Sequence, residues 1–529
     1  MKKLRLIFSI MNSRRKFLQH SGAFVFGSGM LSNLPLIGQA KHAPTLMYAS
    51  PESQGVSSAA VQQYLRAANA SGLEHHSFIL MRHGKIVSEA YWKPYEPDHI
   101  HTLYSLSKSF TSTAIGMAVQ EGRIKLADKV ISFFPEYIPA SVSDNLAKME
   151  IRHALNMATG HTKDTIGAMR DAKGTPWVKT FLSLPIEKEP GTHFLYNTGS
   201  SYTLCAIITK VTGMTTQAYL TPRLFKPLGI TQADWEVSPE GVNLGGYGLR
   251  VSTRDIIKFG QLYLQKGKWE GHQLISEAYV GEATTSHIQS NPGDGDWSQG
   301  YGYQFWRCKP GFYRGDGAFG QFCIVMPQYD AVIAVNSESK DMQKQMTLLW
   351  DHILPGIKDA PLAENKNEEN QLKEFSNSLM LSAQVGSKDN AAIHTLNGKT
   401  FQLTENPWSW KSLLITTGRQ GGVITLKKSD QGLALPFGWN EWKTTGHSII
   451  NPFSADYRSA VPSSVVATAG GEGNDLLKIR LKYTDGIHGD LWSFKYVDEK
   501  NMELSFLSSL AEKGLNNAKE ARALIVGKL

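Results

Sequence analysis

The segment 103–110 reads Leu-Tyr-Ser-Leu-Ser-Lys-Ser-Phe and places Ser105 and Lys108 about one helical turn apart. Apolar residues at helical spacing follow, and Gly122 closes the stretch, so the pattern predicts a buried helix that begins at about Ser105. A serine hydroxyl becomes a good nucleophile when a neighbouring base takes its proton, and a buried lysine with a lowered pKa is such a base. The pair could therefore carry out acyl transfer.

A second interpretation of these residues contains no chemistry. Ser-x-x-Lys occurs three times in the chain, also at Ser13/Lys16 and Ser337/Lys340. By itself Ser105 could be the N-cap of a helix, with Lys108 in solvent one turn further on. The context of the motif has to decide between the two interpretations.

The composition is that of an ordinary globular protein. The 529 residues are 41% hydrophobic and 19% charged, which is enough chain for two or three domains. The formal charge is +8, and six of the positive charges lie within residues 2–16, which leaves +2 for the rest of the chain. A nearly neutral body does not predict a nucleic-acid surface, so we expect no nucleic-acid partner.

The first 43 residues have the features of an export signal. Arg14 and Arg15 stand in the segment Ser-Arg-Arg-Lys-Phe-Leu, which is typical of twin-arginine signals, and an apolar run follows at 22–31. That run is too short for a permanent membrane span. We expect an exported, periplasmic protein that is cleaved after Ala40 or Ala43. A basic tail without a targeting role is the alternative.

The cysteines and histidines predict neither a disulfide framework nor a metal centre. Three cysteines allow at most one internal disulfide, and the sequence leaves open whether Cys308 pairs with Cys323. No group of Cys and His has zinc-like spacing. The histidines at 75, 76, 99 and 101 are expected to be surface residues. We therefore expect no metal and no cofactor.

Residues 44–360 contain helical and strand patterns in a mixed order. The expected helices are 57–70, 105–122, 151–158, 200–211, 253–266 and 342–354. A hairpin is expected at 77–92, and further strands at 300–306, 322–327 and 331–335. Helices at both ends of an antiparallel sheet, with a helical section between them, indicate an α+β domain.

The chain changes character after residue 360. Residues 361–372 are polar and charged and predict a linker, and a short helix is expected near 372–383. Residues 373–529 predict an all-β domain, a sandwich or a small barrel, with a helical tail from about Ala511. The expected strands are 400–403, 413–416, 423–427, 476–483, 491–496 and 502–506.

Three motifs of the first domain occur in a characteristic order. They are the segments 105–108 (Ser-Leu-Ser-Lys), 196–198 (Tyr-Asn-Thr) and 315–321 (Gly-Asp-Gly-Ala-Phe-Gly-Gln). Together they resemble the serine β-lactamase-related hydrolases of the class C type, a family that also contains D,D-peptidases, esterases and 6-aminohexanoate-dimer hydrolases. The resemblance covers about residues 50–355. It implies a β-lactamase/transpeptidase-like domain, in which helices and a helical subdomain flank an antiparallel sheet, and the smaller all-β domain follows it.

The resemblance also implies a role for each motif. Ser105 would be the nucleophile and Lys108 its proton partner. Tyr196 would relay the proton and later activate water, as a phenolate favoured by nearby donors. A buried aromatic cap is the alternative role of Tyr196.

The third motif would stabilise the oxyanion. The N–H groups of Ser105 and Ala318 would form the oxyanion hole, and Gly317 would let the strand approach the substrate because it has no side chain. The remaining residues of the expected substrate-binding set are Asn197, Thr198 and Asp316.

Two departures from the family pattern concern the substrate. The second motif is usually Tyr-x-Asn, whereas here Thr198 is in the third place and the amide is at Asn197. The third motif commonly begins with Lys or His, and here that place is Gly315. Asp316 would repel an anion unless Arg314 points inward. An uncharged small-molecule ester or amide is therefore the expected substrate.

Three functions follow from these motifs. The first is an exported serine hydrolase of the esterase or amidase kind that works through a Ser-Lys-Tyr acyl-enzyme mechanism. The second is a β-lactamase or D,D-peptidase, against which Gly315 argues. The third is a catalytically silent wall- or ligand-binding module in which the β-rich domain does the recognition. The sequence carries no signal for an oligomeric state.

Overall fold

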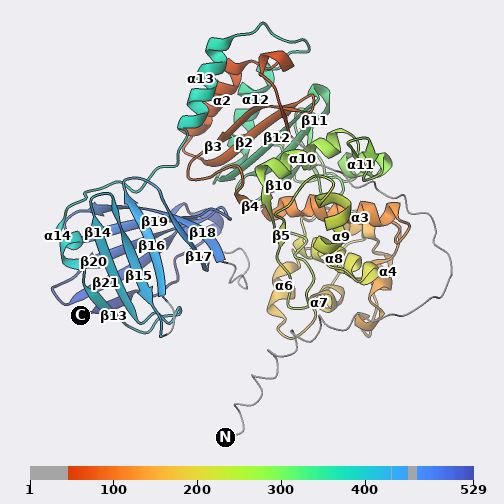
Figure 1. The fold of residues 1–529 in the computed structure, drawn as a ribbon. Helices are drawn as coiled ribbons and strands as arrows, with labels where there is room; N and C mark the ends of the chain where they lie inside the picture. Colours follow the sequence, from red (N-terminus) through yellow and green to blue (C-terminus); the bar gives the residue numbers. More distant parts are fainter. Residues whose placement is uncertain (1–45, 430–431, 451–461) are drawn as a thin grey trace, which may run out of the picture. The chain divides into compact units, whose positions relative to one another are not determined.

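The computed structural model describes residues 46–429, 432–450 and 462–529 (Figure 1). The predicted export signal at 1–43 lies outside these residues. Within the described residues the chain forms a part that mixes helices and strands, and then a β-barrel. The predicted fold class is confirmed.

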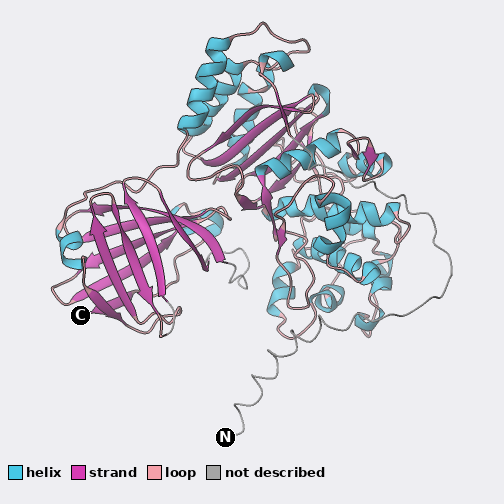
Figure 2. Cartoon of the chain, viewed as in Figure 1, coloured by secondary structure: helices cyan, strands magenta, loops and turns pink. Residues whose placement is uncertain are grey.

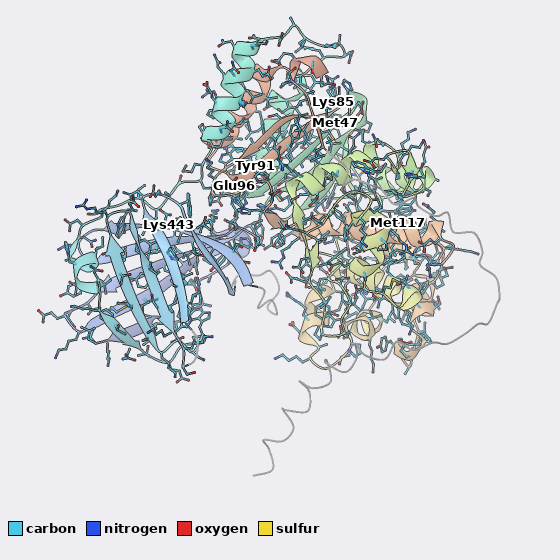
Figure 3. All side chains as sticks on the ribbon, viewed as in Figure 1. Met47, Lys85, Tyr91, Glu96, Met117 and Lys443 are labelled. Atoms are coloured by element: carbon cyan, nitrogen blue, oxygen red, sulfur yellow. The ribbon has the colours of Figure 1, made fainter. Side chains whose placement is uncertain are left out.

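A seven-stranded sheet is the frame of the first part. Its spatial order is β1-β3-β2-β12-β11-β10-β9, and all neighbouring strands are antiparallel except β1 and β3. Figure 3 labels Met47 and Lys85, which are partners in that parallel pair. The strands are β1 (Met47–Tyr48), β2 (Glu74–Arg82), β3 (Lys85–Tyr91), β9 (Trp306–Arg307), β10 (Tyr313–Gly317), β11 (Gln321–Met326) and β12 (Ala331–Glu338).

The side chains of β2 enter two different cores. Phe78 and Leu80 belong to the core under α2 (Ser58–Ala70), α12 (Met342–His352) and α13 (Lys366–Ser378). Ile79 and Met81 belong to the core under α10 (Thr253–Leu264). Successive strand residues point to opposite faces, so the apolar run of β2 suits a sheet with helices on both sides (Figure 2).

A buried helix lies at the centre of the helical section. It is α3 (Ser107–Gln120), and every residue from Ser107 to Ala118 is buried. A 3₁₀ turn, η2 (Tyr104–Leu106), precedes it, and α8 (Thr198–Thr212) packs beside it. The other helices of this section are α4 (Asp144–Lys148), α5 (Ile151–Leu155), α6 (Ile166–Asp171), α7 (Trp177–Ser183), α9 (Thr216–Leu220) and α11 (Glu277–Thr284). A small sheet of β4 (Ile100–Thr102), β6 (Leu249–Ser252) and β5 (Asp234–Trp235) leads into the turn.

The C-terminal sheet has ten strands and forms a barrel. Its order is β16-β15-β14-β13-β22-β21-β20-β19-β18-β17, and a parallel pairing of β16 with β18, the next-to-last strand, closes the sheet. Figure 3 labels Lys443 at the start of β17. The strands are β13 (Thr400–Leu403), β14 (Ser412–Gly418), β15 (Gly421–Lys427), β16 (Gly432–Trp439), β17 (Lys443–Ile450), β18 (Pro462–Glu472), β19 (Leu476–Tyr483), β20 (Gly489–Tyr496), β21 (Asn501–Ser508) and β22 (Ile525–Lys528). Their inward side chains form one apolar core.

Two expectations about the second half of the chain are wrong. The segment 361–372 is not a linker throughout, because α13 begins at Lys366 and packs on α2 through Leu372 and Phe375. The tail is not helical to its end, because a short helix α15 (Ser509–Glu512) is followed by β22, which pairs with β13 and β21. The domain boundaries at 360 and 373 stay a prediction.

Two further expectations fail in the first part. Only Trp306 of the segment 300–306 lies in a strand, β9. The histidines at 75, 76 and 101 are buried rather than on the surface. All three cysteines are buried free thiols, so Cys308 and Cys323 do not pair.

Candidate active site

Three side chains far apart in the sequence converge at the start of α3. Nζ of Lys108 lies 3.0 Å from Oγ of Ser105, within hydrogen-bond distance, and donates to the carbonyl of Gly246 at 2.7 Å. The same Nζ lies 4.7 Å from the ring centroid of Tyr196. The Tyr196 hydroxyl in turn shares a hydrogen bond with Ser105. Hydroxyl, amine and phenol therefore form one contact group.

The interpretation of Ser105 as a helix cap is wrong. The N-cap position of α3 is Leu106, which makes no side-chain cap hydrogen bond, and Ser105 lies in the 3₁₀ turn before it. Lys108 is 1% exposed, so it is not a solvated lysine. Ser105 itself stays partly exposed. The turn therefore presents the hydroxyl to solvent and the amine to the interior.

Burial sets the protonation of Lys108. Desolvation lowers the pKa of its ammonium to about 8, against the charges of Asp164 and Asp316, which raise it. Its two hydrogen-bond partners, Ser105 and the Gly246 carbonyl, carry no charge. A large fraction of Lys108 is therefore neutral near pH 8, as a proton acceptor has to be.

The pKa of Tyr196 is shifted in the opposite direction from that of Lys108. Its ring stacks on Trp306 at 5.4 Å between centroids and meets Tyr301 edge-on at 6.2 Å. Burial raises the pKa of its phenol well above the usual value, the charge of Asp316 raises it further, and the hydrogen bond with Ser105 opposes both. These influences favour the protonated phenol over the phenolate expected from the sequence, and the catalytic role of Tyr196 stays a prediction.

Strand β10 passes directly beside the backbone of the 3₁₀ turn. A Cβ built on Gly317 would lie 2.0 Å from the carbonyl oxygen of Leu103 and 3.1 Å from the backbone nitrogen of Ser105. Only glycine allows this approach of the strand to the turn, and the predicted approach of Gly317 to the substrate stays a prediction. Ala318 follows at the end of β10 and is partly exposed. The backbones of Ser105 and Ala318 are thus brought to the same place.

The first residue of the third motif faces α3. A Cβ on Gly315 would lie 2.4 Å from Leu106 Cδ1 and 2.5 Å from Ser109 Oγ, so a lysine or histidine there would have to displace these two side chains. Arg314 is fully buried and its Nε donates to Asp316 Oδ2 at 2.9 Å. The charges of Arg314 and Asp316 offset each other, so the buried guanidinium of Arg314 is not a free cation at the surface.

Asn197 is engaged within the protein. Its Oδ1 accepts hydrogen bonds from the backbone N–H of Thr165 at 3.1 Å, the Thr165 hydroxyl at 2.8 Å and the backbone N–H of Gly199 at 3.1 Å. Its side chain is 0% exposed and caps α8. The expectation that Asn197 binds substrate directly is therefore wrong, because the amide is used to hold the 159–165 loop. Thr198, the next residue, is partly exposed.

Sequence reasoning missed several residues of this group. Asp164 accepts a hydrogen bond from Thr198 N–H at 2.9 Å, and its charge acts on Lys108 and Tyr196. Gly246 supplies the carbonyl under Lys108, and its only signal in the sequence is a glycine-rich loop. Tyr104 and Phe319 flank the site with φ angles of +47° and +68°. A left-handed conformation costs a bulky residue about 1–3 kcal/mol, and the sequence gives no sign of it.

The described residues contain no helix that combines the length and the apolar character needed to cross a bilayer.

Comparison with known proteins identifies the part of the chain that holds this site. A model of the Beta-lactamase family matches residues 59–355. The chain is 23% identical over 303 residues to the 6-aminohexanoate-dimer hydrolase of Paenarthrobacter ureafaciens, which covers 53% of this chain and 76% of that protein. It is 22% identical over 263 residues to a protein of Salmonella agona provisionally named a D-alanyl-D-alanine carboxypeptidase, with 44% and 61% covered. Lovastatin esterase of Penicillium rubens is 24% identical over 165 residues, with 27% and 41% covered. For the second and third relatives the chain spans less than two thirds of their length.

Proposed function

Since the chain belongs to the Beta-lactamase family of serine hydrolases, we propose that it hydrolyses an uncharged ester or amide through an acyl-enzyme on Ser105. The observation that carries this proposal is the 3.0 Å contact between Ser105 Oγ and the amine of Lys108, which is buried and has a pKa of about 8. Such an amine is both close enough and basic enough to take the hydroxyl proton near neutral pH.

Acylation begins with that proton transfer. Neutral Lys108 accepts the proton of Ser105, and Oγ attacks the substrate carbonyl carbon. The carbonyl oxygen becomes an oxyanion, which the N–H groups of Ser105 and Ala318 stabilise. The close approach of Gly317 to Ser105 N supports this role of the strand.

Tyr196 then serves the leaving group. Its phenol donates a proton to the departing oxygen or nitrogen and recovers one from the Lys108 ammonium, so both side chains return to their starting state. Water attacks the acyl-enzyme by the same route in reverse. The raised pKa of Tyr196 supports a neutral donor rather than a phenolate base.

The third motif supports an uncharged substrate. Gly315 supplies no cation to hold a substrate carboxylate, and the charge of Arg314 is offset by Asp316. Two relatives are named for an amide and an ester substrate, the 6-aminohexanoate dimer and lovastatin. The relative named as a carboxypeptidase favours the second candidate, a D,D-peptidase or β-lactamase.

The first experiment is labelling of the purified full chain with a fluorophosphonate, followed by peptide mapping. We expect label on Ser105 and its loss in Ser105→Ala. Ser109→Ala is the matched control, because it also removes a serine hydroxyl near the start of this helix. The Ser109 hydroxyl is buried and donates to the Gln304 carbonyl, so its loss should not affect labelling. A chain that takes up no label at Ser105 would support the silent-module alternative and end the proposal.

The second experiment is a substrate panel of short-chain chromogenic esters, amides and nitrocefin. We expect turnover of the uncharged esters or amides that disappears in Ser105→Ala. Nitrocefin hydrolysis as fast as ester hydrolysis would contradict the role given to Gly315 and favour the second candidate.

We also propose that residues 1–43 direct export through a twin-arginine route. The pair Arg14-Arg15 ahead of an apolar run supports this. Replacement of both arginines by lysine is expected to retain the precursor inside the cell, and N-terminal sequencing of the exported wild type is expected to begin after Ala40 or Ala43. Unchanged export of the double-lysine variant would contradict the assignment.

A further inference from the structure

A histidine of the C-terminal barrel contacts the residue that precedes the nucleophile. His488 lies in the turn between β19 and β20 and is 3% exposed. Its Nε2 lies 2.5 Å from the Tyr104 hydroxyl. Its ring meets Tyr104 edge-on at 5.9 Å between centroids and Phe319 at 5.1 Å. One side chain of the barrel therefore touches both aromatic residues that flank the reacting backbone.

Both of these aromatic residues have a left-handed backbone. Tyr104, with φ of +47°, immediately precedes Ser105, and Phe319, with φ of +68°, immediately follows Ala318. Their rings also contact each other edge-on at 5.1 Å. A bulky residue keeps this conformation only when its surroundings impose it. The side chains of Tyr104 and Phe319 are the parts through which such a constraint can act.

The histidine is itself held in place. Its Nδ1 lies 2.7 Å from Glu338 Oε1, and because a carboxylate only accepts, Nδ1 carries the hydrogen of that bond, while Nε2 shares a second hydrogen bond with the Tyr104 hydroxyl. Glu338 ends β12 and also receives Lys482 Nζ at 2.9 Å and Lys513 Nζ at 2.6 Å. His488 thus bridges a buried anchor on the catalytic part and the Tyr104 hydroxyl.

Apolar contacts surround this bridge. Ile487 and Leu515 of the barrel are buried against Phe319, and Leu510 packs on the same group. Ala318 and Tyr104 complete it from the other side. The barrel therefore packs apolar side chains against the residues that flank the proposed oxyanion donors.

We propose that His488 is a positioning residue of the hydrolase site: anchored on Glu338, it clamps Tyr104 and Phe319 and thereby sets the direction of the Ser105 and Ala318 N–H groups. This inference rests on the proposed function. It makes the barrel a structural part of the catalytic unit rather than an independent recognition module.

The clamp has a distinct kinetic signature. The oxyanion forms on the way to the tetrahedral intermediate and is absent from the bound ester, so misdirected N–H donors lower kcat and leave KM almost unchanged. We expect Tyr104→Phe, which removes one hydroxyl and keeps the ring contacts, to lower kcat for a chromogenic ester about tenfold. His488→Ala is expected to lower it at least as much.

A double-mutant cycle in the full chain tests whether the two residues act as a unit. The double variant is expected to lose no more than His488→Ala alone, because both changes break the same clamp. His488→Gln is expected to recover much of the loss, since its amide oxygen can accept from Tyr104. Ser509→Ala is the matched control: it removes another hydrogen bond to Glu338, and the one that Ser509 accepts from the Gly489 N–H, without touching Tyr104, and kcat should stay near the wild-type value.

Thermal unfolding identifies variants that fail to fold. If His488→Ala does not fold, the kcat of Tyr104→Phe alone tests the inference. Wild-type kcat in a folded Tyr104→Phe variant, or a loss that appears in KM alone, would overturn the inference. Absence of both ester turnover and Ser105 labelling in the wild type would instead overturn the proposed function.

Discussion

Two lysines of this molecule are equally buried and respond in opposite ways. Lys108 is 1% exposed and Lys482 is 3% exposed. Burial lowers the pKa of Lys108 to about 8. Burial also acts to lower the pKa of Lys482, but the carboxylates of Glu338 and Glu74 overcome it and raise that pKa above the ordinary value. Depth inside the protein therefore does not determine whether a lysine is charged.

The partners of each lysine explain the difference. Lys108 contacts a hydroxyl and a carbonyl, which stabilise an ammonium only weakly in a dry site. Lys482 joins Glu74 and Glu338, which are opposite each other at the end of the β2–β12 ladder and would repel without a cation. A buried amine without an acid is thus expected at a reactive site, and a paired one at a structural site.

The largest effect expected from this comparison is that of Lys108→Met on activity. Loss of the amine that accepts the Ser105 proton in the proposed mechanism should lower kcat/KM for an ester about 10³-fold, while the free energy of unfolding stays the same or rises. Lys258→Met is the control, because this lysine is also buried but pairs with Asp255 at 3.0 Å. Retention of wild-type turnover by the Lys108 variant would remove the base from the mechanism.

The next effect is that of Lys482→Met on stability. The Lys482→Met variant leaves the carboxylates of Glu74 and Glu338 with one cation fewer. Urea unfolding should show that the free energy of unfolding falls by about 3–5 kcal/mol. Lys478→Met removes a more exposed ion pair with Glu472 and should cost less than about 1 kcal/mol. Equal costs for the two variants would mean that the buried cluster does not hold the barrel turn in place.

The smallest effect expected is that of Asp164→Asn on the pH profile. Burial dominates the pKa of Lys108, and the Asp164 charge raises it, so removing that charge should lower it and move the acid limb of kcat/KM to lower pH. Asparagine keeps the oxygen that accepts from Thr198 and Ile166. A shift to higher pH would contradict this electrostatic assignment.

The sequence predicts best what depends on local spacing. The helix at 58–70, the strands at 400–403 and 476–483 and the Ser105–Lys108 pair follow from periodicity and turn residues. The polar residues around Lys366 predicted a linker, and this prediction was wrong because α13 packs on α2 through only two apolar residues, Leu372 and Phe375.

What depends on distant partners could not be predicted. The amide of Asn197 is used by Thr165, and Gly315 is required by Leu106 and Ser109. The contact of His488 with Tyr104 joins residues that are 384 positions apart. No local pattern encodes such contacts, so sequence reasoning placed Ser105 and Lys108 side by side but missed the surroundings that tune them.

The central claim is that Lys108, a buried amine whose lowered pKa makes its neutral form accessible near pH 8, activates Ser105. The pH dependence of fluorophosphonate labelling at Ser105 tests it most directly, because it requires no knowledge of the substrate. The account predicts a rate that rises with pH, with an apparent pKa of about 8, and levels off above it. A rate that keeps rising toward the ordinary lysine value of 10.5, or that follows the same curve in Lys108→Met, would contradict it.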